Sequence, residues 1–544
     1  MKNVLGSIPR RFLFLLAGLA ILIFTSPKWT ISIAPYLGLF FVLRFFRQGS
    51  LKSSIFFGGL GLVLLGMVNG YGVIPIPSPF YYVVAIIIGI KSILPYLLDR
   101  WLSASKRGWL GTLIFPAAGV SLEYFDAITG APTWSSIANT QFQFLELQQL
   151  AAYGGIWLVS FMVLWSAPLI NLIIDHYNQK DAARHYALGG LAVYIAVFII
   201  GFGRLHFSPR SNNEVDVAAI TVNNNKIMEQ VYQDEYGESI ILPLTLSQTS
   251  PMLQKVNQGV MSFIADPDNL KFKATREVLS TVSEELISKV EIAADRGARM
   301  VSWSEAACLL FKEDEAVFMN KLYKLAKDRE IHLIAGFGVM DSEAITNGGL
   351  VLTNKVVTIS PEGELLNTYL KTNPVPFAEP DYGSDGILPV MHTDDIDFSV
   401  VICYDADFNT FMKQVGINKT QVLFVPSGDW YQISPYHTHM AVLQGIANGS
   451  AIVRPVSRGL SVITDSYGRI LASDNFFTSE DHILLSSLPT ATTLTWYNRL
   501  GDFIAIISVF IVLIAIVAQI RKVWLSRGRK TMDTPSSTDR FSVV

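Results

Sequence analysis

The sequence predicts a bundle of eight membrane-spanning helices joined to a layered α/β domain. Half of the 544 residues are apolar and the mean hydropathy is +0.37, yet 16% of the residues are charged. The charged residues are unevenly spread, which indicates a membrane part and a soluble part. The predicted parts are a seven-helix bundle (1–207), a catalytic domain (208–498), an eighth helix (499–522) and a disordered cytoplasmic tail (523–544).

The membrane part is predicted from apolar segments. Each segment has about the length that a helix needs to cross a hydrocarbon layer roughly 30 Å thick. Backbone groups in lipid must satisfy their hydrogen bonds internally, so helices are the expected structure. The segments cover about 11–26, 30–46, 54–72, 81–98, 109–125, 148–173, 187–203 and 502–520.

Basic residues indicate how these helices are oriented. Lys and Arg gather at the N-terminus, in alternate loops and after the last segment, whereas the loops between these are nearly free of them. Since such residues favour the cytoplasmic side, both termini are expected in the cytoplasm and the α/β domain outside. The residues on the predicted cytoplasmic side include Lys2, Arg10, Arg11, Arg44, Arg47, Lys52, Arg100, Lys106, Arg107, Lys180, Arg184, Arg521 and Lys522.

Two features inside the bundle leave alternatives open. Glu123 follows an apolar run, and we expect its carboxylate to reach the membrane interface rather than to face a cavity. The pair Gly154-Gly155 opens the sixth segment, where small residues allow either close helix packing or room for a lipid chain.

Composition narrows the function of the soluble part. The net charge of −3 gives no sign of a nucleic-acid partner. The two cysteines, Cys308 and Cys403, are too few for a disulfide framework or a zinc ribbon. His437 and His439 could suggest a metal, but a spacing of two puts them on different helix faces, and we expect no carboxylate or Cys partner close by. We therefore expect neither a metal nor a cofactor.

The soluble part alternates strands and helices, which predicts a layered α/β domain. A polar, irregular segment at 223–271 is expected to be a mobile cover over the site, since long loops are commonly functional. The predicted helices are 274–296, 314–328 and 436–448. The predicted strands are 215–221, 299–304, 332–339, 350–359, 365–370, 398–402, 421–427, 451–456, 460–465 and 482–487.

Three reactive side chains each follow one of these strands. Glu305 ends VSWSE, Lys371 ends LNTYLK, and Cys403 follows the apolar run within 396–408. A carboxylate can deprotonate a thiol, an ammonium can stabilise a thiolate and an oxyanion, and a backbone N–H can supply a second oxyanion donor. The set therefore predicts acyl transfer through a thioester on Cys403.

The motifs WSEAA, YLKTNPVPFAE, VICYDADF and PSGDWYQ resemble those of the nitrilase, or carbon–nitrogen hydrolase, superfamily. That resemblance implies an α-β-β-α sandwich with Glu305 as base, Lys371 as triad lysine and Cys403 as nucleophile. It also implies that Glu379 supports the lysine and that the Tyr404 N–H serves the oxyanion.

The flanking residues resemble the family less closely. Trp430 matches the family's tryptophan beside the pocket, and Asp405, also placed at the pocket, stands where the family has Glu. Ser304 replaces the Pro before the base, and Gly428-Asp429 replaces Asn-Asp. Further departures are Asn223-Asn224-Asn225 at the start of the domain and the run Arg454-Pro455-Val456-Ser457-Arg458-Gly459.

With its helices, the chain resembles the apolipoprotein N-acyltransferase family of bacterial inner-membrane enzymes. The resemblance implies a phospholipid acyl donor, a diacylglyceryl-cysteine lipoprotein as acceptor, contact with membrane lipid, and a catalytic domain in the periplasm. We expect the protein to act as a monomer. Two other hypotheses remain: a membrane-anchored amidase or nitrilase that hydrolyses an extracytoplasmic C–N bond, and a degenerate lipid-binding scaffold.

Overall fold

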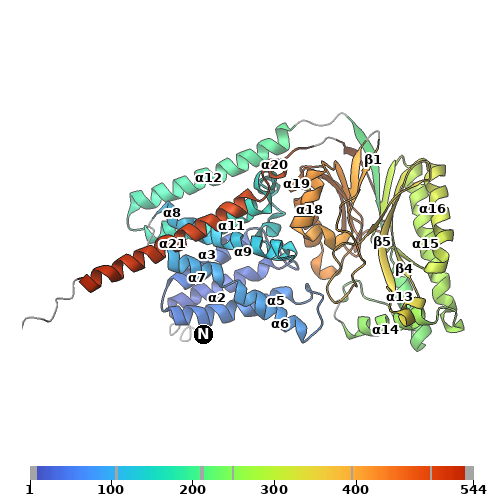
Figure 1. Ribbon diagram of the computed structural model, residues 1–544, viewed down its shortest axis with the longest axis horizontal. Coiled ribbons are helices and arrows are strands. Elements are labelled where there is room, and N and C mark those ends of the chain that lie inside the picture. Colours follow the sequence, from blue (N-terminus) through green and yellow to red (C-terminus); the bar gives the residue numbers. More distant parts are fainter. Residues whose placement is uncertain are drawn as a thin grey trace, which may run out of the picture.

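The computed structural model has two parts, a helical bundle and a domain of two packed sheets (Figure 1). It describes residues 9–103, 108–208, 213–247, 250–393, 396–490 and 493–532. Lys2, Lys106 and Arg107, which entered the topology prediction, and residues 533–544 of the tail predicted to be disordered lie outside the described residues.

Helices occupy all eight predicted apolar segments. Among the described residues, five continuous stretches are long and apolar enough to cross a membrane by length and composition, namely Leu51–Gly70, Phe80–Leu102, Ala151–Asp175, Lys180–Phe207 and Phe503–Leu525. The bundle contains α2 (Arg10–Leu22), α3 (Ala34–Arg47), α4 (Leu51–Ser53), α5 (Gly59–Gly70), α6 (Phe80–Lys91), α7 (Leu94–Leu102), α8 (Trp109–Thr112), α9 (Ile114–Ile128), α10 (Leu145–Gln148), α11 (Ala151–Asp175), α12 (Lys180–Phe207) and α21 (Phe503–Met532).

Helix α11 is the central helix of the bundle, and its two glycines allow close packing. Gly155 has a φ of +65°, which breaks the helical geometry at this point. The Tyr497 ring lies against Gly155, where an added Cβ would come within 2.5 Å of it. Of the two alternatives for Gly154-Gly155, the described contacts support close packing, here between α11 and α20 (Trp496–Leu500).

The α/β domain is a four-layer sandwich, as the family resemblance implies. One sheet has the order β15-β1-β2-β4-β5-β6 with β3 beside β4, and the other has the order β14-β13-β11-β9-β8-β7. The first contains β1 (Glu214–Ile220), β2 (Met300–Trp303), β3 (Cys308–Phe311), β4 (His332–Met340), β5 (Leu352–Ile359), β6 (Leu365–Leu370) and β15 (Ile483–Pro489). The second contains β7 (Val390–His392), β8 (Asp397–Val400), β9 (Val422–Phe424), β11 (Ala451–Arg454), β13 (Leu460–Thr464) and β14 (Ile470–Asn475).

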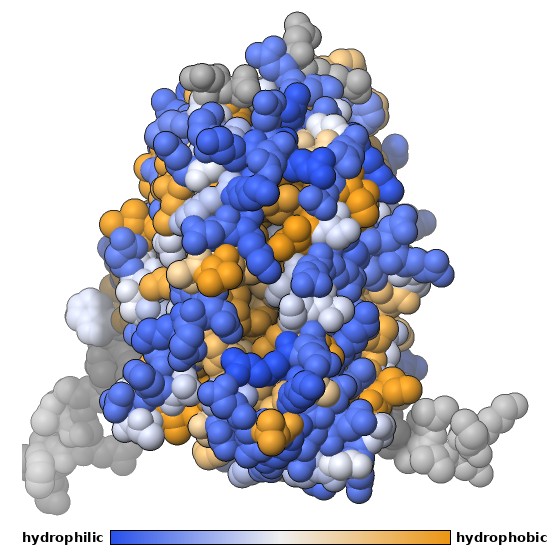
Figure 2. All heavy atoms as spheres, turned by 90° about the vertical axis from the view of Figure 1, so that its right-hand side faces the viewer, coloured by the Kyte–Doolittle hydropathy of each residue, from blue (hydrophilic) through white to orange (hydrophobic). Residues whose placement is uncertain are grey.

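Different helices cover the two outer faces. α15 (Lys273–Asp295) and α16 (Glu315–Arg329) cover the first sheet, and their outer surface is mainly hydrophilic (Figure 2). α19 (Tyr436–Asn448) lies on the second sheet and shares a buried apolar cluster with the bundle, through Leu443 and Ile446. The second sheet therefore faces the membrane part and the first faces away from it (Figure 1).

The prediction of an irregular segment at 223–271 is wrong. The segment contains α13 (Asn225–Tyr236) and α14 (Pro251–Ala265). Ser250 caps α14 by accepting a hydrogen bond from the Leu253 N–H, and Pro251 occupies the first turn. α13 is polar apart from a short apolar stripe, and the long connection between the two helices, residues 237–250, hid the hairpin in the sequence. At the other end of the chain, α21 continues to Met532, beyond the predicted end of the eighth helix.

Candidate active site

Cys403 lies where the chain turns sharply after β8. The strand ends at Val400, and Cys403 begins a 3₁₀ turn, Cys403–Asp407, with a φ of +46°. A residue with a side chain adopts this left-handed conformation only under constraint. Here the constraint includes the Cys403 N–H, which donates to the Pro426 carbonyl at 2.9 Å. The thiol lies 3.6 Å from the Gly428 carbonyl oxygen.

Asp405 holds this turn in place through buried hydrogen bonds, so the prediction that Asp405 lies at the pocket is wrong. Its carboxylate is fully buried and is not part of the cavity wall. It accepts hydrogen bonds from the Tyr369 hydroxyl at 2.8 Å, the Ile402 N–H at 3.0 Å and the Asn373 N–H at 2.6 Å. Burial raises the pKa of Asp405 to about 6, while Lys371 and these donors oppose the rise. The carboxylate joins the nucleophile turn to the chain that follows Lys371.

The structure brings Glu305 and Lys371 together as an ion pair beside Cys403. Lys371 Nζ lies 2.8 Å from Glu305 Oε1 and 2.7 Å from Glu379 Oε2, and its side chain is 1% exposed. Asn354 on β5 donates to both carboxylates, at 2.7 Å to Glu305 and 3.2 Å to Glu379. The sequence analysis did not predict Asn354, because its position beside Glu305 follows only from the pairing of β5 with β4.

Burial and the neighbouring charges together keep both Lys371 and Cys403 protonated. Burial opposes the charge on Lys371, but Glu305, Cys403 and Glu379 outweigh it and hold the lysine pKa well above its usual value. Burial and the Glu305 charge raise the pKa of the Cys403 thiol well above its usual value, against the opposing effect of Lys371. Cys403 is therefore a neutral thiol at rest, and it would need a base to act as a nucleophile.

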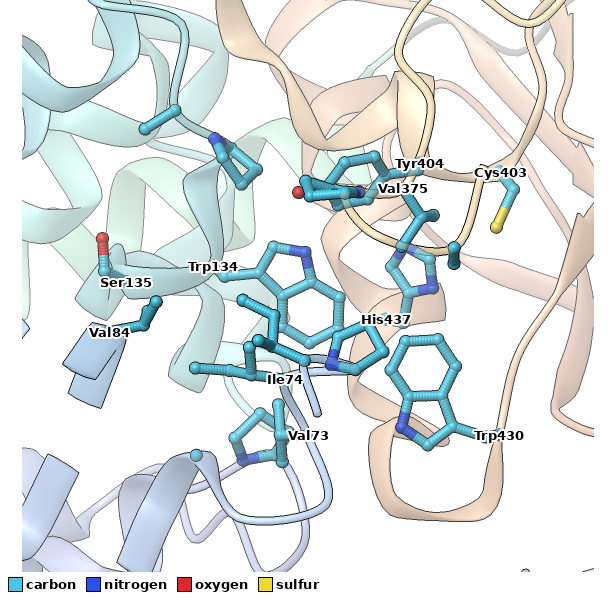
Figure 3. Close-up of a pocket in the computed structure, with 18 of the residues that line it drawn as sticks. Val73, Ile74, Val84, Trp134, Ser135, Val375, Cys403, Tyr404, Trp430 and His437 are labelled. Atoms are coloured by element: carbon cyan, nitrogen blue, oxygen red, sulfur yellow. The ribbon is translucent and has the colours of Figure 1, made fainter. Parts of the chain in front are cut away.

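A single large cavity joins this site to the membrane helices. Its volume is about 1310 Å³, and its wall includes Glu305, Lys371, Glu379, Cys403, Tyr404 and Trp430. Figure 3 shows Cys403 and Trp430 on the side of the α/β domain and Ile74 and Val84 on the side of the bundle. Trp430 bridges the two parts, since its Nε1–H donates to the Gly72 carbonyl at 2.8 Å.

Glu123 faces this cavity, so the prediction that it reaches the membrane interface is wrong. Its carboxylate accepts hydrogen bonds from the Ser160 hydroxyl at 2.7 Å, the Ser136 hydroxyl at 2.9 Å and the Ile137 N–H at 3.0 Å. Two of these donors belong to the loop after α9. The partners that draw Glu123 inward come from distant segments, which the sequence around Glu123 does not reveal.

A second buried charged cluster lies on the other side of Cys403. His437 places Nδ1 at 2.7 Å from Asp429 and Nε2 at 3.0 Å from Asp407. Arg454 Nη2 lies 3.3 Å from Asp429. Burial opposes the charge on His437, but Asp407 and Asp429 raise its pKa to about 9. The expectation that His437 lacks acidic neighbours is therefore wrong, because three other segments supply its partners.

This second cluster has one feature of a metal site. Cys403, Asp429 and His437 each offer a ligand atom, and these atoms lie within 4.8 Å of one another. However, both His437 nitrogens already contact carboxylates, and the Arg454 guanidinium lies 3.0 Å from Nδ1. A metal ion would have to replace the imidazole proton beside a fixed positive charge, so the donor set suits a protonated histidine better. His439 lies elsewhere, stacked on Phe142 with a ring separation of 4.4 Å.

The membrane part also touches this second cluster. Trp134, in the loop after α9, donates its Nε1–H to Asp407 at 2.8 Å, and its ring lies 5.1 Å from the His437 ring (Figure 3). Sequence reasoning missed Trp134, and only the docking of the two parts reveals it. The other cysteine, Cys308, is buried on β3 and is free, as is Cys403.

Comparison with known proteins agrees with both parts of this arrangement. Residues 242–496 match the carbon–nitrogen hydrolase family, and residues 16–169 match the N-terminal domain of apolipoprotein N-acyltransferases. Among solved structures, an amidase from Nesterenkonia sp. aligns with 52% of this chain and 93% of its own, at 15% identity. Its TM-score is 0.34, a level that does not by itself define a common fold.

Several curated relatives are similar over most of the chain. The apolipoprotein N-acyltransferase of Geobacter metallireducens is 22% identical over 85% of this chain and 84% of its own. That of Azotobacter vinelandii is 23% identical over 80% of each chain, and that of Rickettsia prowazekii is 23% identical over 77% of this chain and 80% of its own. The fold and the site thus define a membrane protein with a carbon–nitrogen hydrolase domain. The chain belongs, as a divergent member, to the apolipoprotein N-acyltransferases of the nitrilase superfamily.

Proposed function

We propose that the protein moves a fatty acyl chain from a phospholipid, through a thioester on Cys403, to the N-terminal amine of a diacylglyceryl-cysteine lipoprotein. The cavity carries this proposal, because one continuous space holds Cys403, Lys371 and Glu305 and is also lined by membrane helices. Both substrates carry lipid chains, and exposing each buried methylene to water costs about 0.8 kcal/mol. A site that opens to the bundle avoids that cost.

In the first half-reaction Cys403 attacks the ester carbonyl of the phospholipid. Glu305 takes the thiol proton as the S–C bond forms, and Lys371 together with the Tyr404 N–H stabilises the oxyanion. The C–O bond then breaks, and the proton passes to the lysophospholipid oxygen. The acyl thioester on Cys403 remains.

In the second half-reaction the α-amine of the acceptor attacks the thioester carbonyl. Glu305 receives a proton from the nitrogen, the C–S bond breaks, and the Cys403 sulfur regains a proton. The product is an amide. In this scheme Glu379 and Asn354 hold Lys371 and Glu305 in place, and their hydrogen bonds to the pair support that role.

The positions of the basic residues support a topology for this reaction. In the proposal all eight helical segments span the inner membrane, both termini lie in the cytoplasm, and the catalytic domain at 208–498 lies in the periplasm. The catalytic cavity would then lie near the outer leaflet. Trp430 would line the substrate entrance at the junction with the bundle, where it contacts Gly72.

Labelled phospholipid tests the first half-reaction directly. Wild type is expected to form an acyl adduct on Cys403 that hydroxylamine releases, and Cys403→Ala is expected to form none. Cys308→Ala serves as the matched control and should keep the adduct. Wild type without an adduct, or with amide hydrolysis that needs no phospholipid, would contradict the proposal.

A further inference from the structure

An arm of the cavity within the catalytic domain has no assigned occupant. It runs between helix α14 and the start of strand β5, on the far side of Asn354 from Lys371. We define it as the distal arm by the residues that line it, which are Met228, Val260, Met261, Ile264, Leu350 and Leu352.

The distal arm is continuous with the reactive centre. Leu352 and Asn354 are two residues apart on β5, so their side chains lie on the same face of the sheet. Asn354 donates to Glu305, and Leu352 lies roughly 7 Å further along the strand. Gly338 lines the cavity beside them, and the side chains of Leu309 and Leu352 both lie over that glycine. An apolar floor thus begins directly beside Glu305.

One stripe of α14 forms the roof of the arm. Leu253, Asn257, Val260, Met261 and Ile264 all line the cavity, and their spacing puts them on one face of the helix. The stripe is about 16 Å long. Met261 is 47% exposed although it lines the cavity, which means that its side chain borders open space rather than packed protein.

The residues that line the distal arm indicate which kind of ligand it binds. None of the described cavity residues that α13, α14 and the start of β5 contribute carries a charge, whereas Lys91, Glu123 and Asp126 line the cavity in the bundle. Methionine side chains adapt to apolar ligands of varied shape. The bundle end can accommodate a charged head group, and the distal arm favours a hydrocarbon chain.

We propose that the distal arm holds the acyl chain that is transferred, while it is bound to Cys403. This inference rests on the proposed function, since it concerns the chain of the same thioester. The thioester carbonyl lies beside Glu305 and Lys371, and the chain continues from it along Leu352 and beneath α14. The arm then sets which chain lengths are accepted.

Two methionines on α14 provide a matched test. Met261 faces the arm, whereas Met252, which is 41% exposed, is not part of the cavity wall. Nine residues separate them, which places them on opposite faces of the helix. Both are replaced by tryptophan, and each variant receives a mixture of phospholipids with decanoyl or hexadecanoyl chains. Mass spectrometry then gives the ratio of the two adducts on Cys403.

In Met261→Trp the ratio should shift towards decanoyl by about tenfold or more, since a filled pocket rejects the methylenes that no longer fit. In Met252→Trp it should stay within about twofold of wild type. Val260→Phe narrows the arm with a smaller ring than that of tryptophan, and it should also shift the ratio towards decanoyl. An unchanged ratio in Met261→Trp and Val260→Phe overturns the inference and leaves the proposed function intact. Equal shifts of the adduct ratio in Met252→Trp and Met261→Trp also overturn the inference. Both faces of α14 would then influence the chain, as expected if α14 lay on the membrane.

A second measurement does not depend on acyl transfer. A fatty acid that carries a terminal diazirine is crosslinked to the Cys403→Ala protein, and the labelled peptides are mapped. Labels are expected on α14 and at 350–352, and they should be lost in the double variant Cys403→Ala/Met261→Trp. Labels confined to the bundle overturn the inference. A wild type that forms no adduct would refute the proposed function, and this mapping would still decide whether the arm binds a chain.

Discussion

Two buried charged clusters flank Cys403, and they differ in how their charges are balanced. The first, Glu305, Lys371 and Glu379, has two carboxylates for one ammonium and lines the cavity. The second, Asp407, Asp429, His437 and Arg454, has two carboxylates for two cations when His437 is protonated. The side chains of the second cluster are at most 3% exposed.

The difference indicates separate tasks for the two clusters. In the first, burial and the Glu305 charge raise the pKa of Cys403, and the carboxylates raise the pKa of Lys371 against the effect of burial, so a carboxylate beside a protonated thiol can accept its proton. In the second, Arg454 and His437 lower the pKa of Asp429 against the effect of burial, and no charge is in surplus. Asp429 and His437 also line the cavity, so the contrast lies in the charge balance: a balanced cluster stabilises structure, whereas an unbalanced one can do acid–base chemistry.

The largest predicted effect comes from the first cluster. Lys371→Met should reduce thioester formation by about 10³-fold, because the oxyanion loses a charged donor. It should also destabilise the fold by about 3 kcal/mol, because the buried Glu305 and the partly buried Glu379 would be left without a cation. Adduct formation with labelled phospholipid and thermal unfolding in detergent measure the two effects.

The double variant Lys371→Met/Glu379→Gln separates the two effects. Removing one carboxylate should restore much of the melting temperature and leave thioester formation as slow as in the single variant. A double variant that regains activity would mean that Lys371 acts only as a structural counter-ion, and the contrast between the clusters would fail.

An intermediate effect is predicted for the second cluster, and it depends on pH. The folded-state pKa of His437 is raised from 6.5 to about 9, so the folded protein binds this proton more tightly than the unfolded chain. The stabilisation is complete below about pH 6.5, is lost as pH rises through about 9, and amounts to at most about 3 kcal/mol. His437→Gln should therefore lower the melting temperature most near pH 6 and little near pH 9.5, as a pH series of unfolding curves would measure.

His392→Gln is the matched control for this series. His392 also pairs with an aspartate, at 2.8 Å, but its side chain is 73% exposed. An exposed pair contributes little, so this variant should follow wild type at every pH. If His437→Gln lowered the melting temperature equally from pH 6 to pH 9.5, the imidazole would be neutral in the fold and the cluster would not be balanced.

The sequence predicted the reactive residues better than their surroundings. Glu305, Lys371 and Cys403 each follow a strand, and that local pattern can be read without the fold. Every residue that was missed or misplaced acts through distant partners. Asp405 was expected at the pocket because it neighbours Cys403, but its acceptor oxygens face Tyr369 and Asn373, on a different segment.

The prediction of strands and helices was limited in the same way, because some of them also depend on distant partners. Period-two and spacing-four patterns located most strands and the helix at 274–296, because each has a wide apolar face. Helix α13 has a narrow apolar face among polar residues, and part of the apolar stripe of α14 lines the cavity. Trp134 gains its partner Asp407 only through the docking of the bundle onto the α/β domain, whereas Glu123 and His437 gain theirs from distant segments of their own part.

The smallest predicted effect concerns that docking. Trp134→Phe keeps a ring against His437 and removes the N–H that Asp407 accepts at 2.8 Å. A hydrogen bond to a charged group contributes about 1.5–3 kcal/mol, so the melting temperature should fall by a few degrees. Thioester formation should stay within about threefold of wild type, because the balanced cluster supports the Cys403 turn without taking part in proton transfer. If Trp134→Phe stopped thioester formation while the protein remained folded, the bundle would contribute directly to the chemistry at Cys403. The two clusters would then differ in position but not in task.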